Sequence, residues 1–113
     1  MCTLKVIVVD VYTSTENEIP KTYELYQNFP NPFNPSTNIK FDIPETSNVK
    51  LIVVNLLGEQ LDVLINEVME AGSYNVKWDG ANYSSGIYFC KIISLSQVSN
   101  QRYVKVQKML MIK

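Results

Sequence analysis

The chain has 113 residues, of which 46% are hydrophobic and 19% charged, and its ten basic and eleven acidic side chains leave a net charge of −1. This length predicts one domain, and seven Tyr, four Phe and one Trp in a nearly neutral chain exclude intrinsic disorder. Uninterrupted apolar runs reach four residues, whereas a membrane-spanning helix needs about 20. The sequence therefore contains no such helix, and its near-zero charge argues against nucleic-acid binding.

Histidine is absent, which removes Ser-His and Cys-His nucleophilic pairs, histidine bases and histidine-ligated metals. A glycosidase with paired carboxylates has no support, because the acidic residues fall in turns and on polar strand faces. Asp79, Asn82 and Ser84 carry oxygens that could ligate Ca²⁺, but they lack the density of a calcium-binding loop. Composition therefore favours a binding or structural module that is not an enzyme and needs no cofactor or metal.

The two cysteines, Cys2 and Cys90, are too few for a disulfide scaffold or a zinc site. They could form one bridge only if the N-terminus packs beside residue 90. The simpler interpretation is a buried free thiol at Cys90.

The first 21 residues differ from the rest. Leu4–Tyr12 has strong strand propensity, whereas Thr13–Lys21 is polar and linker-like. Met1–Tyr12 is not a secretory signal, because its apolar stretch is too short and no small-residue cleavage site follows. We expect residues 1–21 to be an N-terminal strand and linker, either the remnant of an upstream domain or a strand that pairs with another chain. One domain then spans residues 22–113.

A proline-rich segment opens this domain. Within Tyr23–Thr37, three prolines fall in the six positions 30–35. Each proline removes a backbone donor and fixes φ, so the segment cannot be a central strand. We expect a stiff, polyproline-like edge segment in which Phe29 and Phe33 are apolar anchors.

Apolar and polar side chains alternate with a period of two through much of the remaining chain. Residues 39–43 and 73–78 alternate apolar with polar side chains, as half-buried strands do. Trp78 is expected in the core, directly before a turn at Asp79-Gly80. Residues 49–54 and 86–94 are apolar on both faces, and the second of these is expected to be a central strand.

Two further strands have less regular patterns. In the first, Leu61, Val63 and Ile65 are expected on one face, although Leu64 interrupts the alternation. In the last strand, the residues expected to share a face are Val104, Val106, Leu110 and Ile112. Turn residues separate the strands at intervals of roughly ten residues, which predicts an all-β antiparallel sandwich.

Five blocks then become recognisable in order: YELYQNFPNPFNPSTNIKFDIP, NVKLIVVNLLGEQL, EAGSYNVKWDG, SSGIYFCKI and VQKMLMIK. Together they closely resemble the type A C-terminal sorting domain of the type IX secretion system, found in the Bacteroidetes and their relatives. The resemblance runs from about Tyr23 to Lys113. That family is similar to the immunoglobulin-like domain of flagellar hook-capping proteins, which implies an immunoglobulin-like sandwich of about seven strands.

The resemblance implies a non-catalytic tail that directs an upstream cargo domain through the periplasm and across the outer membrane. The tail is recognised by the outer-membrane secretion machinery and is often removed by a surface sortase, which leaves the cargo secreted or anchored at the cell surface. Carried over by motif, the signature positions are Pro30, Asn31, Pro32, Gly86, Tyr88, Lys108, Leu110 and Lys113. The resemblance implies that they serve recognition or folding.

Two interpretations stay open for the Pro-Asn-Pro segment and for the charge pattern. The segment either caps one end of the sandwich or also contacts the machinery directly. From residue 86 to the end there are five basic side chains and no acidic one, namely Lys91, Arg102, Lys105, Lys108 and Lys113. They are either the polar side of two strands or a cationic face for an acidic receptor or anionic polysaccharide.

A second function comes from a different class. Leu4–Tyr12 is long, β-prone and nearly uncharged, so it is a liability unless it pairs. It could add to the sheet edge of a neighbouring copy, which would make the protein a structural subunit of an extracellular assembly.

Overall fold

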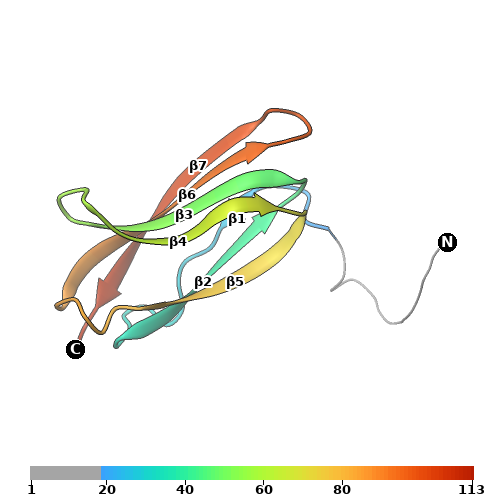
Figure 1. Ribbon diagram of the computed structural model, residues 1–113. Coiled ribbons are helices and arrows are strands. Elements are labelled where there is room, and N and C mark those ends of the chain that lie inside the picture. The colour runs from blue at the N-terminus through green and yellow to red at the C-terminus, as the bar shows by residue number, and fades with distance from the viewer. Residues whose placement is uncertain (1–18) are drawn as a thin grey trace, which may run out of the picture.

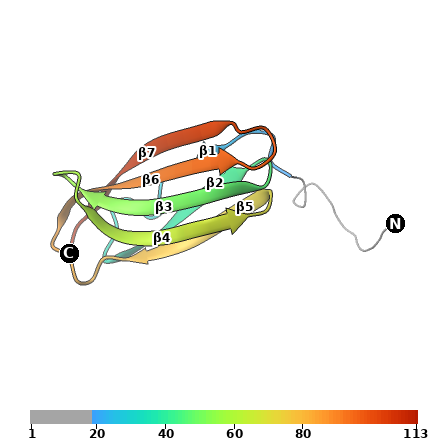
Figure 2. The same ribbon diagram turned by 45° about the horizontal axis from the view of Figure 1, so that its top comes forward.

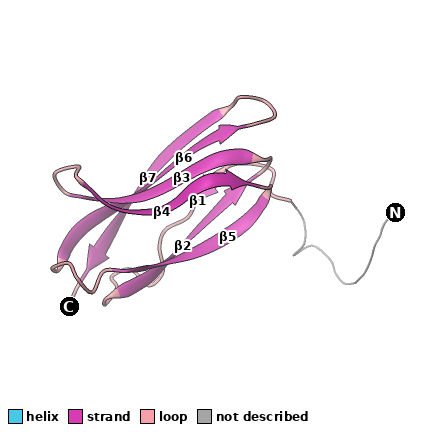
Figure 3. Ribbon diagram, viewed as in Figure 1, coloured by secondary structure: helices cyan, strands magenta, loops and turns pink. Residues whose placement is uncertain are grey.

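The computed structural model describes residues 19–113 and contains seven β-strands and no helix in that range (Figures 1 and 3). None of the described elements is therefore a helix that could cross a membrane. The strands are β1 (Glu24–Leu25), β2 (Ser36–Ile43), β3 (Ser47–Asn55), β4 (Gln60–Met69), β5 (Gly72–Asp79), β6 (Gly86–Ser96) and β7 (Arg102–Met111).

The strands form two sheets that pack face to face. A three-stranded sheet has the order β1-β2-β5 and a four-stranded sheet the order β4-β3-β6-β7, with all neighbouring strands antiparallel (Figure 2). The chain changes sheet after β2, β4 and β5. Such crossings are typical of Greek-key sandwiches, and the predicted all-β sandwich of seven strands is confirmed.

Alternating side chains explain β2 and β5, and apolar runs explain β3 and β6. Ile39, Phe41 and Ile43 are buried, and Trp78 on β5 is only 2% exposed, so the predicted inward faces are confirmed. The strand from Gly86 lies between β3 and β7, as its two apolar faces predict.

The predicted face of β4 is wrong at one position. Leu61 and Ile65 pack against the core, but Val63 points outward and is exposed. The cause is a β-bulge: Leu51 pairs with Ile65 and Ile52 pairs with Val63, so Leu64 is an extra residue that shifts the alternation.

The residues expected to share a face of β7 do share one, but it is the outer face and not the buried one. Val104 and Val106 are 44% and 49% exposed, and Ile112 is exposed beyond the strand, whereas Met109 and Met111 are fully buried. Pairing fixes this orientation, because Met109 lies opposite Tyr88, whose side chain is buried. Alternation then turns the valines to the outside.

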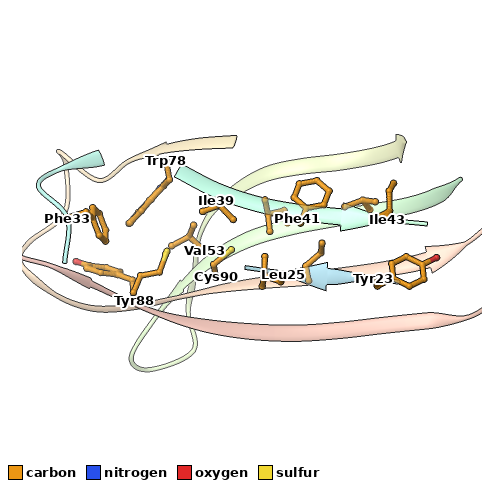
Figure 4. Packing of buried hydrophobic residues seen from close by; sticks show 14 of the residues in the cluster. Tyr23, Leu25, Phe33, Ile39, Phe41, Ile43, Val53, Trp78, Tyr88 and Cys90 are labelled. Carbon is orange, nitrogen blue, oxygen red and sulfur yellow. The ribbon is translucent and has the colours of Figure 1, made fainter. Parts of the chain in front are cut away.

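The core lies between the two sheets along their whole length (Figure 4). Its largest fully buried side chains include Trp78, Phe33, Phe41 and Leu25. Cys90 lies among them as a buried free thiol, as expected, and burial raises its pKa to about 12. Cys2 and Leu4–Tyr12 lie outside the described residues, so the predictions about them stay predictions.

Candidate recognition site

The Pro-Asn-Pro segment closes one edge of the sandwich against the end of β7. Its start bridges Phe29 to Asn38 of β2, and its end bridges Phe33 to Met111 of β7, so it passes from one sheet to the other. The Phe33 N–H donates to the carbonyl of Leu110 at 3.0 Å, and the Ile112 N–H donates to the Phe33 carbonyl at 2.9 Å. The expected edge position is confirmed.

Asn31 adds a side-chain bond to the same junction. Its Oδ1 accepts the backbone N–H of Leu110 at 3.0 Å, so an edge strand donor that would otherwise be free is satisfied. Gln27 contributes from nearby, because its Nε2 donates to the Lys108 carbonyl at 2.9 Å. Two side chains and two backbone bonds thus bind the segment to the last strand.

A buried polar pair holds the proline turn itself. Asn28 is 3% exposed, and its Nδ2 donates to Thr37 Oγ1 at 2.9 Å and to the Pro30 carbonyl at 3.2 Å. The Thr37 hydroxyl donates to the same carbonyl at 2.9 Å. Because these groups are buried and bonded to one another, their hydrogen bonds to the Pro30 carbonyl fix the position of Pro30 from the core side.

The two predicted aromatic anchors behave differently. Phe33 is 2% exposed and packs edge-on against Trp78, with 5.7 Å between the ring centroids. Phe29 is 77% exposed, so it is not an anchor. Its backbone pairs with Asn38, and this pairing directs the side chain away from the core.

Gly86 and Tyr88 lie beside the same end of β7. They pair with Met111 and Met109, respectively. The Tyr88 ring is 5.6 Å from that of Trp78, and its hydroxyl donates to the Ser84 carbonyl at 2.5 Å. Tyr88 therefore fixes the loop before β6 as well as filling the core.

The last residue is held by this loop. The Lys113 N–H donates to Ser85 Oγ at 2.9 Å, and its Nζ donates to the Ala81 carbonyl at 2.7 Å. Lys108 contributes only its carbonyl to the bonds described above, and its side chain is exposed. The end of β7 is therefore bonded on both sides, by the proline segment and by the β5–β6 loop.

All eight predicted signature positions thus gather at one end of the sandwich, which we call the signature end: Pro30, Asn31, Pro32, Gly86, Tyr88, Lys108, Leu110 and Lys113. The pyrrolidine rings, Asn31, Lys108 and Lys113 are exposed, Gly86 and Leu110 are half-buried, and Tyr88 is buried. The exposed members are accessible to a partner, whereas Tyr88 acts through packing.

A cluster of aromatic rings supports the signature end from inside. Trp78 contacts Phe33, Tyr83 and Tyr88, and its Nε1–H donates to Asp62 Oδ2 at 2.7 Å. Figure 4 shows Phe33, Trp78 and Tyr88 converging at this end of the core. Desolvation raises the pKa of the Tyr83 phenol, with a smaller contribution from the Asp62 charge. Such edge-on and tilted pairs add to the stabilisation from burial.

The basic side chains of the last two strands do not form one face. Lys91, Arg102 and Lys108 occupy outward positions of the four-stranded sheet. Lys105 has the opposite orientation, and its Nζ lies 3.5 Å from the Glu24 carboxylate. Lys113 is bonded to the β5–β6 loop.

Residues 79–84 form a turn held by local hydrogen bonds. Asp79 Oδ1 accepts the N–H of Ala81 at 2.9 Å, and the Tyr83 N–H donates to the Gly80 carbonyl at 2.9 Å. Within residues 19–113 no group of three or more His, Cys, Asp or Glu side chains could hold a metal ion.

Three contributors to the signature end were missed from the sequence: Gln27, Asn28 and Ser85. Their bonds join residues that are up to 81 positions apart, and alternation carries no signal for such contacts. Asn28 could have been suspected, because asparagine beside a proline turn often bonds to nearby backbone.

The chain can now be compared with known protein families. A family model described as the secretion system C-terminal sorting domain matches residues 27–107. Pro30, Asn31, Pro32, Gly86 and Tyr88 fall inside this range, and the other three signature positions follow it. No curated protein and no solved structure matched the chain. The matched range covers most of the chain, and we conclude that it belongs to the family of C-terminal sorting domains of type IX secretion, which are non-catalytic and target cargo across the outer membrane.

Proposed function

We propose that the secretion machinery recognises the signature end of the sandwich. Membership of the family implies interaction with this machinery and a secreted or surface location. The observation that carries the proposal is the junction at Leu110, where Asn31 Oδ1 and the Phe33 backbone bind the last strand at 3.0 Å. Through it, residues about 80 positions apart in sequence present one surface.

Preorganisation is the physical reason to assign recognition to this end. Exposed Pro30, Asn31 and Pro32 rest on the buried Asn28–Thr37 pair and on Phe33. A partner that binds them does not have to order a flexible loop, so more of the contact free energy remains as affinity. The exposed Lys108 and Lys113 add positive charge beside them, which speeds the encounter with an acidic partner.

The remaining steps follow the family. The domain over residues 22–113 is the sorting unit, and residues 1–21 connect it to an upstream cargo domain. The cargo enters the periplasm, the outer-membrane machinery reads the tail, and a surface sortase cleaves it and anchors the cargo.

Reporter export tests this proposal with matched charge reversals. The chain is fused to a periplasm-directed reporter in a host that has type IX secretion, and we expect the reporter outside the cell. Lys108→Glu with Lys113→Glu should lower thermal stability only slightly, because both side chains are exposed and the Lys113–Ala81 bond that is lost is open to water, and should reduce export. Lys21→Glu with Lys40→Glu makes the same change in net charge on exposed residues away from the signature end, and export should persist.

Two results would contradict the proposal. If the folded Lys108/Lys113 variant is exported as well as the unmodified domain, the basic end is not the recognised feature. If even the unmodified fusion stays in the periplasm, this chain does not deliver cargo by itself.

The structural-subunit alternative depends on Leu4–Tyr12, which lies outside the described residues. It stays a prediction, and native mass measurement tests it: strand exchange between copies gives oligomers that disappear when residues 1–21 are deleted. A monomer of the full chain would remove this alternative.

A further inference from the structure

The outward faces of the two sheets differ in chemistry. On the three-stranded sheet the outward positions are polar: Asn38, Lys40, Asp42, Ser73, Asn75 and Lys77. On the four-stranded sheet, which faces the viewer in Figure 2, the register turns many apolar side chains outward: Ile52, Val54, Val63, Val68, Ile87, Phe89, Ile93, Leu95, Val104, Val106 and Leu110. An antiparallel sheet with one face in water normally carries polar residues there.

This apolar outer face contains a groove. It lies over β3, β6 and β7, has a volume of about 470 Å³, and is bounded at one end by the β3–β4 turn. Ile52, Val54, Phe89 and Val106 line it, together with Lys91. Ile52 is only 8% exposed, Val54 and Phe89 are half-buried, and Val106 is exposed, so the groove is partly open to solvent. Apolar surface that stays open to solvent typically marks an interaction site.

The charges on this face are all of one sign. Lys50, Lys91, Arg102 and Lys108 occupy outward positions, and none of the outward positions of the four strands carries an acidic residue. Lys91 lies between Ile52 and Val106 in the register, so a cation stands within the apolar surface itself. A second copy docking through the same face would bring these cations together, which disfavours self-association.

We propose that the outer face of the four-stranded sheet docks a partner protein through an apolar segment flanked by acidic residues. The apolar side chains fill the groove between Val54 and Val106, and the carboxylates pair with Lys91 and its basic neighbours. Burial of apolar area supplies the affinity, and the charges orient the segment and speed its association. The groove itself contains no signature position, although Lys108 and Leu110 belong both to this outer face and to the signature end.

Peptide binding to the isotope-labelled full chain tests the inference by NMR. The probe is Glu-Glu-Leu-Phe-Leu-Glu-Glu, with two comparison peptides: one has lysine in place of each glutamate, and the other has serine in place of the three apolar residues. We expect saturable shifts in the methyl groups of Ile52, Val54 and Val106 with the probe alone. Added salt should weaken this binding, because the charges lie at the surface.

Matched variants separate charge at the groove from charge in general. Lys91→Glu should weaken binding of the probe by about fivefold or more, because it replaces attraction with repulsion. Lys77→Glu, on the polar sheet, should leave the affinity unchanged. The chemical-shift spectrum of each free variant reports whether it is folded.

Several outcomes would overturn the inference. These are no saturable shifts at the groove, equal binding of either comparison peptide, and equal weakening by Lys77→Glu. Concentration-dependent shifts without peptide would assign the face to a second copy. Methyl shifts at the groove upon deletion of residues 1–21 would assign it to the chain's own N-terminal segment.

Discussion

At the signature end, Phe33, Trp78, Tyr83 and Tyr88 pack with ring centroids 5.6 to 6.2 Å apart. Away from the signature end, hydroxyl groups share the interior with two separate stacked pairs, Tyr23 with Tyr103 and Phe41 with Tyr74. Three serines are buried on that side, Ser47, Ser94 and Ser96, and Ser94 Oγ has no hydrogen-bond partner among residues 19–113.

The difference lies in how many contacts restrain each end of the sandwich. Aromatic packing at the signature end supports exposed residues that are also tied to β7 by hydrogen bonds. The opposite end carries the β6–β7 turn, where Asn100 has a positive φ of 61°, and its aromatic rings form separate pairs rather than one connected cluster. A rigid end suits a recognition surface, because it lowers the entropic cost of binding.

The largest expected effect comes from Trp78→Ala. The indole is 2% exposed and contacts three other aromatic rings, so its loss should cost about 3–5 kcal/mol of unfolding free energy. Chemical denaturation of the full chain measures this cost. A loss under about 1 kcal/mol would mean that the aromatic cluster does not support the signature end.

A smaller effect is expected at the opposite end from Tyr23→Phe. The Tyr23 hydroxyl lies 2.8 Å from Ser47 Oγ in the interior, and the Ser47 hydroxyl donates to the Glu45 carbonyl. The variant keeps the stack on Tyr103 and removes one bond, which should cost about 1 kcal/mol. If it costs as much as Trp78→Ala in the same denaturation assay, the contrast between the ends is wrong.

Asn31→Ala should cost about 0.5–1 kcal/mol, because it removes a hydrogen bond that is exposed to water. Asn31→Asp is the matched control, since a carboxylate oxygen can still accept the Leu110 N–H. Hydrogen exchange at Leu110 should accelerate in the alanine variant only. Equal exchange rates in both variants would show that Asn31 does not hold the last strand.

The smallest expected effect is a pH dependence of stability that comes from Tyr26, which lies beside the three-stranded sheet. Its hydroxyl donates to Asp42 Oδ2 at 2.5 Å, and this bond, with smaller contributions from burial and charge, raises the pKa of Tyr26 to about 12. The folded pKa of Tyr26 exceeds the ordinary value of about 10. The contribution of this hydrogen bond to the free energy of unfolding is therefore complete below pH 10 and is lost as pH rises through about 12.

The free energy of unfolding, measured as a function of pH, tests the direction of this effect. The stability difference between the unmodified chain and Tyr26→Phe should be constant up to about pH 10 and shrink above it. The effect should be small, because Tyr26 is 39% exposed. A difference that grows with pH would contradict the assignment of Tyr26 as the donor.

Much of this fold could be predicted from alternation, and the failures have local causes. Strands β2 and β5 have faces that their residues specify, and the two apolar faces of β6 indicated its central position. In β4 the bulge at Leu64 cannot be read from composition, because either neighbour could be the extra residue. In β7 both faces carry apolar residues, so alternation alone did not decide that Met109 and Met111 point inward rather than Val104 and Val106.

The signature end was only partly predictable for a related reason. Prolines in residues 30–35 indicated an edge, and Phe33 was correctly expected in the core. Phe29 was misplaced, because both phenylalanines precede or follow prolines and the sequence does not distinguish their orientations. The bonds of Gln27 and Ser85 depend on long-range packing, which becomes visible only when the sheets are assembled.

The most direct test of recognition at the signature end is site-specific photo-cross-linking in secreting cells. A photoreactive residue replaces Lys108 in the reporter fusion, and a control fusion carries it at Lys21, which is also exposed and lies beside Tyr23 and Tyr103 at the opposite end. We predict cross-links from position 108, and not from position 21, to an outer-membrane component of the secretion machinery. An exported fusion that cross-links to this machinery from position 21 but not from position 108 would contradict the account.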